Sequence, residues 1–509
     1  MKLVKSLLLG SAAGLIAVGG AQAADLPVKA KAVEYVKICS LYGAGFYYIP
    51  GTDTCIKFGG YLRADMLFNT NSDYGIGQGA PGGANNRLDN YYQTRARLDF
   101  TIDTRTATEY GVVRTYADTV FSWDATSVTG SAPSAFSVGS ASLGLYHAFI
   151  QFAGFTFGRT VSIFDAPWQS YPAGGPDFLP GGSNNVTGVN QVAYTADFGQ
   201  GITGSVALQD MTTAAGGQSN LWNASVTGVA GAVGGFATTA AAGAAFIQGI
   251  YGVNDWGGTR MPDIVGQVRV DQAWGLFQIS AAAHELHSAY YGTTEPTGHP
   301  SDKWGWAVQG ALSIKNIPTG AGDSINLQAV YTDGASRYNF QSLFPQTIFI
   351  YGGSGIAYQS VGFAGIADGV FGSGTGIETV KTWGFRGGYT HNWSPNWSSG
   401  IYGAYASLRY GDASKALICA NFAAALAPVA GSTCNPDFNL AVVGGNLVWT
   451  PVKGLAFTAD VSYVWLDQKH SGVVTGANTA NLAVAKPAAT YELKDQGNLQ
   501  MLLRAQRNF

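Results

Sequence analysis

The tetrapeptide His284-Glu285-Leu286-His287 carries residue types that hold zinc in metalloproteases. That motif needs its second histidine four positions after the first, on one face of a helix, and position 288 is Ser. On a strand, His284 and His287 would point to opposite faces. The glycine-rich run 372–376 is not flanked by a strand and a helix, so it does not predict a nucleotide-binding loop. No nucleophile–base pair is recognisable, and the sequence therefore predicts no enzyme, no metal site and no cofactor.

Four arginines could instead act through permanent charge. Arginine stays protonated and holds a fixed geometry, which suits it to line a polar surface. Three of them fall on the polar positions of alternating segments and the fourth is expected there too; they are Arg63, Arg95, Arg97 and Arg114. Opposite charge comes from the proline-rich stretch 164–190, which carries Asp165 and Asp177 and no lysine or arginine. The two groups are candidates for oppositely charged walls.

The N-terminus has the pattern of a secretory signal peptide. Lys2 and Lys5 precede a short apolar run over 7–18, and Ala21-Gln22-Ala23 supplies a small-residue cleavage site. A membrane anchor helix is the alternative, but spanning a bilayer takes about 20 apolar residues. We therefore expect residues 1–23 to be removed, which leaves a periplasmic segment over 24–55 before the main domain.

The four cysteines form two short-range pairs, Cys39 with Cys55 and Cys419 with Cys434. An exported protein meets an oxidising compartment, where disulfides persist. A metal site would need closer spacing and histidine partners, which the sequence lacks. The sequence therefore predicts two disulfides, with four free thiols as the alternative.

The composition departs from that of a soluble domain. Charged residues make up 12% of the chain, against about 25% in typical soluble domains. The formal net charge of −3 argues against a nucleic-acid partner. The stretch 211–254 has no charged residue, yet it is built of Gly, Ala, Thr and Ser, whereas a spanning helix needs Leu, Ile, Val and Phe. We interpret it as part of a long loop, with a spanning helix as the alternative.

Segments of about ten residues with period-two alternation recur along the chain. In the segment 94–104, apolar residues such as Phe100 alternate with polar ones such as Arg97 and Asp99. Similar segments lie at 56–66, 264–271, 325–332, 457–466 and 499–509. Short turns are predicted at 104–107, 153–154, 199–201, 272–274, 316–322, 392–395 and 450–453. Long links are predicted at 67–91, 119–142, 164–190, 211–262, 287–303, 333–379, 410–436 and 467–496.

Seven short turns and eight long links join sixteen strands. An even strand number, short periplasmic turns and long outer loops are typical of bacterial outer-membrane barrels, whose backbone bonds close on themselves. The predicted fold is therefore all-β, a 16-stranded antiparallel transmembrane β-barrel over 56–509. Its last strand ends on Phe509 at the periplasmic rim, facing outward, and must pair with the strand that starts near Ile56.

The sequence resembles the general porins of α-proteobacteria, the family found in rhizobia and brucellae. The resemblance rests on the signal segment KSLLLGSAA (5–13), on VKICSLYGAGFYYIPGTDTCIKFGGYLR (36–63) and on the C-terminal RAQRNF. It implies a homotrimer of barrels in the outer membrane, each an aqueous pore with an inward-folded third loop. It also implies that the barrel assembly machinery reads Phe509. Outer-membrane lipid and lipopolysaccharide are the expected surroundings.

A barrel of sixteen strands is wide enough for an aqueous channel, so selectivity must come from a charged constriction. We hypothesise that the stretch 164–190, the third outer loop, faces the arginines and creates a transverse field. Alternatively, the arginines pair with Asp65, Asp99 and Asp103 and only neutralise the lumen. The expected function is passive diffusion of small hydrophilic solutes and ions. The alternatives are a channel specific for sugars or anions, or a barrel that acts as adhesin or enzyme. The loops 211–262 and 333–379 have no predicted role.

Overall fold

The computed structural model describes residues 37–69, 82–83, 92–125, 140–168, 179–183, 186–214, 219–224, 243, 245–247, 249–340, 348–475 and 486–509. The chain divides into two compact units, Met1–Cys55 and Ile56–Phe509. The predicted signal peptide and the first part of the segment 24–55 lie outside the described residues. No helix in these ranges is long and apolar enough to cross a membrane.

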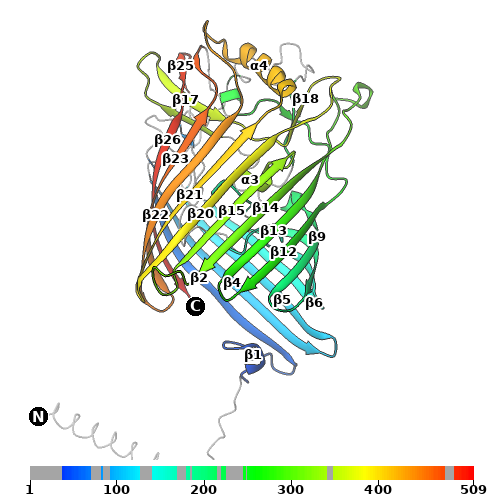
Figure 1. Cartoon of the computed structure of the whole chain (residues 1–509), viewed down its shortest axis with the longest axis vertical. Coiled ribbons are helices and arrows are strands. Elements are labelled where there is room, and N and C mark those ends of the chain that lie inside the picture. Colours follow the sequence, from blue (N-terminus) through cyan, green and yellow to red (C-terminus); the bar gives the residue numbers. More distant parts are fainter. Residues whose placement is uncertain are drawn as a thin grey trace, which may run out of the picture. The chain divides into compact units, whose positions relative to one another are not determined.

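The second unit is a closed antiparallel barrel (Figure 1). In the described part of the chain, sixteen strands form it: β2 (Thr54–Asn69), β4 (Tyr92–Thr108), β5 (Gly111–Asp124), β6 (Ser140–Phe152), β7 (Phe155–Thr160), β8 (Val189–Asp197), β9 (Ile202–Asp210), β12 (Asp263–Gln272), β13 (Gly275–Leu286), β14 (Lys303–Lys315), β15 (Ser324–Asp333), β20 (Lys381–Ser394), β21 (Trp397–Arg409), β22 (Phe438–Val452), β23 (Leu455–Gln468) and β26 (Gln496–Asn508). Each pairs with its neighbour in the chain, and β26 closes the ring by pairing with β2. This confirms the predicted fold.

The alternation of apolar and polar residues that predicted the strands corresponds to side chains that face lipid and lumen in turn. On β12, β15 and β20 the side chains of Val268, Leu327 and Phe385 are exposed on the outer face. Their neighbours Gln267, Gln328 and Arg386 are buried inside the barrel. Apolar side chains outside and polar ones inside are what a strand needs between hydrocarbon and a polar lumen.

Several predicted connections begin too early. β5 continues to Asp124, into the link predicted at 119–142, and β20 and β22 continue to Ser394 and Val452, into the turns predicted at 392–395 and 450–453. The first turn is displaced most. The first short turn was predicted at 104–107, but β4 continues to Thr108 and β5 begins at Gly111. The residues around Arg105 are polar on both faces, so the alternation gives no signal for where the strand ends. The register shows the continuation, since Arg105 still pairs with Arg114 across the two strands. Gly111, at φ 113°, starts the return strand.

The outer loops fold into two small sheets and a helix, which together we call the outer cap. One sheet contains β10 (Leu221–Asn223), β11 (Val253–Asn254), β18 (Gly369–Phe371) and β19 (Glu378–Thr379). The other contains β3 (Gly82–Gly83), β16 (Ile348–Gly352), β17 (Gln359–Ala364), β24 (Gly472–Thr475) and β25 (Thr490–Leu493). The helix is α4 (Asp412–Leu426), and a single turn, α3 (Arg337–Phe340), lies in the loop after β15.

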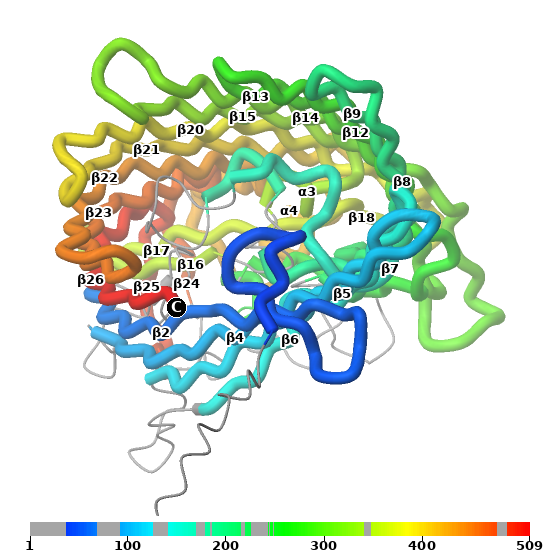
Figure 2. Tube along the Cα trace, turned by 90° about the horizontal axis from the view of Figure 1, so that it is seen from below, coloured from blue at the N-terminus to red at the C-terminus, as the bar shows by residue number. Residues whose placement is uncertain are grey.

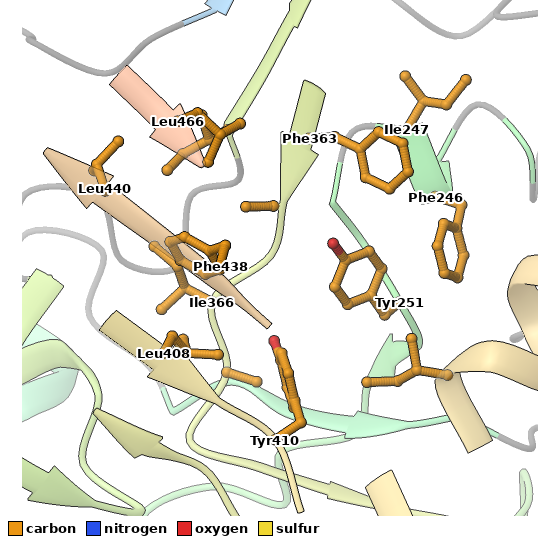
Figure 3. Packing of buried hydrophobic residues seen from close by; sticks show 14 of the residues in the cluster. Phe246, Ile247, Tyr251, Phe363, Ile366, Leu408, Tyr410, Phe438, Leu440 and Leu466 are labelled. Atoms are coloured by element: carbon orange, nitrogen blue, oxygen red, sulfur yellow. The ribbon is translucent and has the colours of Figure 1, made fainter. Parts of the chain in front are cut away.

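The outer cap has its own hydrophobic core, which continues onto the barrel wall (Figure 3). Phe246 and Tyr251 from one loop pack with Phe363 from another and with Phe422 of α4. The same cluster includes lumen-facing side chains of β21, β22 and β23, namely Leu408, Leu440 and Leu466. Five described residues of the loop 211–262 belong to this core: Trp222, Ala224, Phe246, Ile247 and Tyr251.

His470 makes this core sensitive to acid. Its ring stacks on Phe422 at 5.3 Å between ring centres, and its Nδ1 accepts a hydrogen bond from the backbone N–H of Asn435. Its Nε2 is buried without a partner among the described residues. Burial lowers the pKa of His470 to about 3.

We expect the outer cap to lose stability as the pH falls from about 6.5 toward 3, because the unfolded histidine takes up a proton that the folded one excludes. The loss at pH 5 is about 2 kcal/mol, from 1.5 pH units at 1.36 kcal/mol each. Near-ultraviolet circular dichroism between pH 7 and pH 4 would follow it. His470→Phe should flatten the pH dependence, while His299→Gln should leave it as in the wild type. Equal pH dependence in His470→Phe would contradict this account.

Both predicted disulfides are present. Cys39 and Cys55 are bonded at the centre of a small core in the first unit, with Phe46 between them in the sequence. Cys419 and Cys434 join α4 to the chain that leads into β22. Closing a loop of about 15 residues contributes roughly 3 kcal/mol by the chain-entropy estimate. The described residues contain no free cysteine.

Candidate pore constriction

The described parts of the third loop, which joins β7 to β8, are residues 161–168, 179–183 and 186–188, and they lie inside the barrel (Figure 2). Its first part is bound by side-chain amides of lumen-facing glutamines. Gln267 donates to Ile163 O at 2.6 Å, and Gln278 and Gln309 donate to Asp165 O and Phe164 O at 2.9 and 2.8 Å. These strands are β12, β13 and β14, so the loop follows the inner wall away from β7.

The loop is bound again at 179–183 by Arg386 of β20. Its guanidinium donates to Leu179 O at 3.0 Å and to Ser183 O at 2.7 Å. Its Nε donates to Gln328 of β15 at 2.9 Å. Gly181, at φ 91°, lies so close to the wall that an added Cβ would be 2.4 Å from the Phe385 carbonyl oxygen. These contacts confirm that the third loop is inward-folded.

Of the two aspartates predicted in the third loop, the structure describes one. Asp165 is 2% exposed, beside Phe164, whose ring packs on Tyr338 of α3 at 4.5 Å. Burial lowers the pKa of Arg337, the neighbour of Tyr338, and nearby acids including Asp165 offset part of that effect. Asp177 lies outside the described residues. Asp165 is therefore buried at the root of the loop, near Arg337 of α3, and it belongs to the lining of a recess in the lumen wall.

The four candidate arginines lie on neighbouring strands, on the inner face of β2, β4 and β5. Arg95 forms a two-bond ion pair with Asp124 at 2.7 Å. Arg97 donates to Ser122 at 2.9 Å, and Arg63 to Gln506 at 2.8 Å. Arg114 pairs with Asp103 at 3.0 Å. Arg63 and Arg97 both lie close to Tyr61, whereas Arg114 stands opposite Arg105, ten positions along β4 from Arg95, which is about 33 Å along a strand. The four arginines therefore share one wall of the barrel but do not form a single cluster.

Acidic residues interleave this wall. Asp103 also pairs with Arg105 at 3.0 Å, and Asp65 pairs with Arg504 at 2.7 Å. Sequence reasoning named Asp65 and Asp103 as possible partners, but it missed Arg105, Asp124 and Arg504. Arg504 lies in the alternating segment 499–509, so its inward orientation could be predicted. Arg105 falls in the turn predicted at 104–107 and Asp124 in the link predicted at 119–142, so neither was assigned to a strand. The sequence also did not show which strand would stand opposite each of them.

A buried Ser–His–Asp chain is a second arrangement that spacing did not reveal. His284 Nδ1 is 2.7 Å from Asp263 Oδ1, and its Nε2 is 2.7 Å from Ser219 Oγ. The same Asp263 accepts a hydrogen bond from the Tyr338 hydroxyl at 2.6 Å. A nucleophilic serine must reach its substrate, whereas Ser219 is 4% exposed. These hydrogen bonds hold two outer loops against β12 and β13, so the Ser–His–Asp arrangement has a structural role.

Comparison with known proteins agrees with this geometry. A family model described as "Porin subfamily" matches residues 25–502. The porin Omp2b of Brucella canis is 31% identical over 343 residues, which cover 65% of this chain and 85% of the relative. Omp2b of Brucella suis is 30% identical over the same shares. The solved structure of the outer membrane channel DcaP of Acinetobacter baumannii has the same fold, with a TM-score of 0.57 and 15% identity over 91% of this chain and 99% of that one.

The family match and the barrel settle what kind of protein this is. The matched region covers more than nine-tenths of the chain, and the strands that it spans close into a barrel with a polar interior. The resemblance in the N-terminal segment predicted the same family. The chain belongs to the porin subfamily and is a channel of the outer membrane.

Proposed function

We propose that this porin is a passive-diffusion channel for small hydrophilic solutes and ions, narrowed by its third loop. One observation supports the proposal: side-chain amides hold residues 163–165 of the loop against β12, β13 and β14, and Arg386 holds residues 179–183 against β20. The arginines occupy the wall formed by β2, β4 and β5. A channel whose lumen is polar and whose narrowest part is charged selects by charge and size.

The proposed constriction contains Arg63, Arg95, Arg97 and Arg114 with Asp165 and Asp177. In this proposal the arginines supply the positive charge of the constriction, because lumen charges tune the selectivity of porins. Asp165 fixes the root of the loop, and Asp177 is the proposed acidic counterpart. The ion pairs of Arg95 and Arg114 reduce the net charge of the wall without removing its local dipoles.

We expect Arg95→Ala to shift the channel toward cations, because it leaves Asp124 without its cationic partner. The cation-to-anion permeability ratio should rise by about twofold, since lumen charges set selectivity in such pores. Asp165→Asn should shift the ratio in the opposite direction. Reversal potentials across a salt gradient measure both, with the exposed outer residue Arg260 (Arg260→Ala) as control. Unchanged ratios in both variants would remove the charged-constriction hypothesis.

The remaining proposals follow from the family. The chain is exported by the signal peptide 1–23, forms a homotrimer in outer-membrane lipid and lipopolysaccharide, and performs no catalysis. Phe509 is proposed as the signal that the barrel assembly machinery reads. In support, Phe509 is exposed and its backbone N–H donates to Gly60 O at 3.1 Å, across the closing seam.

A further inference from the structure

Beneath the third loop, the lumen wall contains a polar recess of about 440 Å³, which we call the alcove. Its roof is the loop segment 160–167, and its walls come from β6, β7, β8, β9 and β12. Its wall residues lie near the short turns at 153–154 and 198–201, so the alcove opens on the periplasmic side of the loop. Small-molecule sites usually have volumes of about 300–1,000 Å³.

Four of the nine residues that the strands contribute to the walls carry hydroxyl groups, and three are glutamines. In the register of the strands, Thr195 of β8 stands opposite Ser205 of β9, and Thr203 of β9 stands opposite Arg269 of β12. Thr195 Oγ1 and Ser205 Oγ are 2.9 Å apart. Thr156 of β7 extends this hydroxylated surface. Hydroxyls both donate and accept hydrogen bonds, so they match a solute that carries hydroxyls of its own.

Arg269 is the cation of the alcove. Its Nε donates to Gln278 Oε1 at 3.0 Å, and it forms no ion pair with any residue that the structure describes. The nearby Asp271 pairs instead with Lys315 at 3.7 Å. The acid in the alcove lining, Asp165, is buried beside α3. This differs from Arg95, Arg114 and Arg504, each of which is already paired with an aspartate.

We propose that the alcove binds a small hydroxylated anion, with its carboxylate or phosphate on Arg269 and its hydroxyls on Thr203, Thr195 and Ser205. The guanidinium offers a planar fork that matches either anionic group. No aromatic side chain belongs to the described lining, so the surface on which a neutral sugar ring would stack is missing. The inference rests on the proposed channel function, because the solute reaches the alcove through the pore.

Planar-bilayer recording of the purified trimer tests the proposal. Gluconate, added to each side in turn at millimolar concentration, should interrupt the ion current, whereas glucose and acetate should do so at least about tenfold more weakly. The same recording with glycerol 3-phosphate in place of gluconate distinguishes recognition of a phosphate from recognition of a carboxylate. Block by either hydroxylated anion supports the shared chemistry.

Variants locate the site. Arg269→Gln should weaken the block about tenfold, and Arg269→Lys, which keeps the charge without the fork, should weaken it less. Thr203→Val should weaken the block by gluconate and leave that by acetate unchanged. Arg260→Gln, which removes an exposed cation outside the alcove, should behave as the wild type.

Three results would overturn the proposal: a conducting wild-type channel that neither anion blocks, equal block of wild type and Arg269→Gln, or equal block by acetate and gluconate. A trimer that does not conduct at all would instead contradict the proposed channel function. The two failures are therefore distinguishable.

Discussion

Replacing Arg386 with methionine is expected to release the third loop from the wall and to enlarge the pore. Arg386 is 2% exposed and binds Leu179 O, Ser183 O and Gln328 Oε1. Methionine fills a similar volume but offers no donor, so two loop carbonyls and one amide oxygen lose their partner. Each buried unsatisfied group costs about 1–3 kcal/mol, so the anchoring of the loop should weaken by at least about 3 kcal/mol. The single-channel conductance and the size limit of permeating solutes should both rise.

Liposome swelling with sugars of increasing mass measures this effect, together with single-channel recording. Arg260→Met is the matched control, because Arg260 is 62% exposed in its side chain and pairs with Asp302 on the outer surface. A correctly folded Arg386→Met channel with the wild-type conductance and size limit would show that the loop is held by other contacts.

Breaking the ion pair between Asp65 and Arg504 is expected to destabilise the barrel at the seam where its two ends meet. The residues stand directly opposite each other on β2 and β26 and are 4% and 9% exposed. Arg504 also lies near Asp460 of β23. Removal of one partner of a buried ion pair leaves an uncompensated charge and costs about 3–5 kcal/mol. Arg504→Met should cost more than Asp65→Leu, because it leaves two acids behind.

The double variant Asp65→Leu/Arg504→Met supplies the control within the seam. Buried ion pairs can often be replaced by apolar residues with little net loss, so the double variant should be more stable than Arg504→Met alone. Unfolding in urea with lipid micelles, followed by the heat-dependent gel shift of the barrel, gives the free-energy differences. Additive losses in the double variant would show that the two side chains do not act as a pair.

The barrel could be predicted from sequence because its two environments are opposite in polarity. Each strand places residues such as Phe385 in lipid and Arg386 in the lumen, and this contrast is visible at period two. The prediction failed locally at Arg105, where both faces are polar and no contrast marks the end of β4. The disulfides followed from spacing, because each pair is separated by only 16 or 15 positions.

The contacts that hold the third loop could not be predicted in the same way. Gln267, Gln278 and Gln309 look like ordinary polar lumen residues, and their role depends on where the carbonyl groups of the loop pass. Arg386 is isolated in the sequence, and its partners Leu179 and Ser183 lie about 200 positions away. The four arginines were predicted as lumen residues for good reason, but their pairing with Asp124 and Asp103 depends on strand register.

The outer cap was missed for a related reason. The loops 211–262 and 333–379 show neither alternation nor helical periodicity, so each looks structureless alone. Trp222 and Tyr251 are buried only because a second loop and α4 bring Phe363 and Phe422 to them. A core assembled from five separate links has no local signature. Low charge was the one available signal, and it indicated burial without indicating a partner.

The single-channel conductance as a function of salt concentration tests the central claim most directly. A water-filled channel should give ohmic steps whose size grows in proportion to KCl between 0.1 and 1 M, which is about the proportionality expected when ions move in bulk-like water. Three equal sub-steps would further support the trimer. Absence of conductance, or a conductance that saturates at low salt, would contradict a passive-diffusion pore.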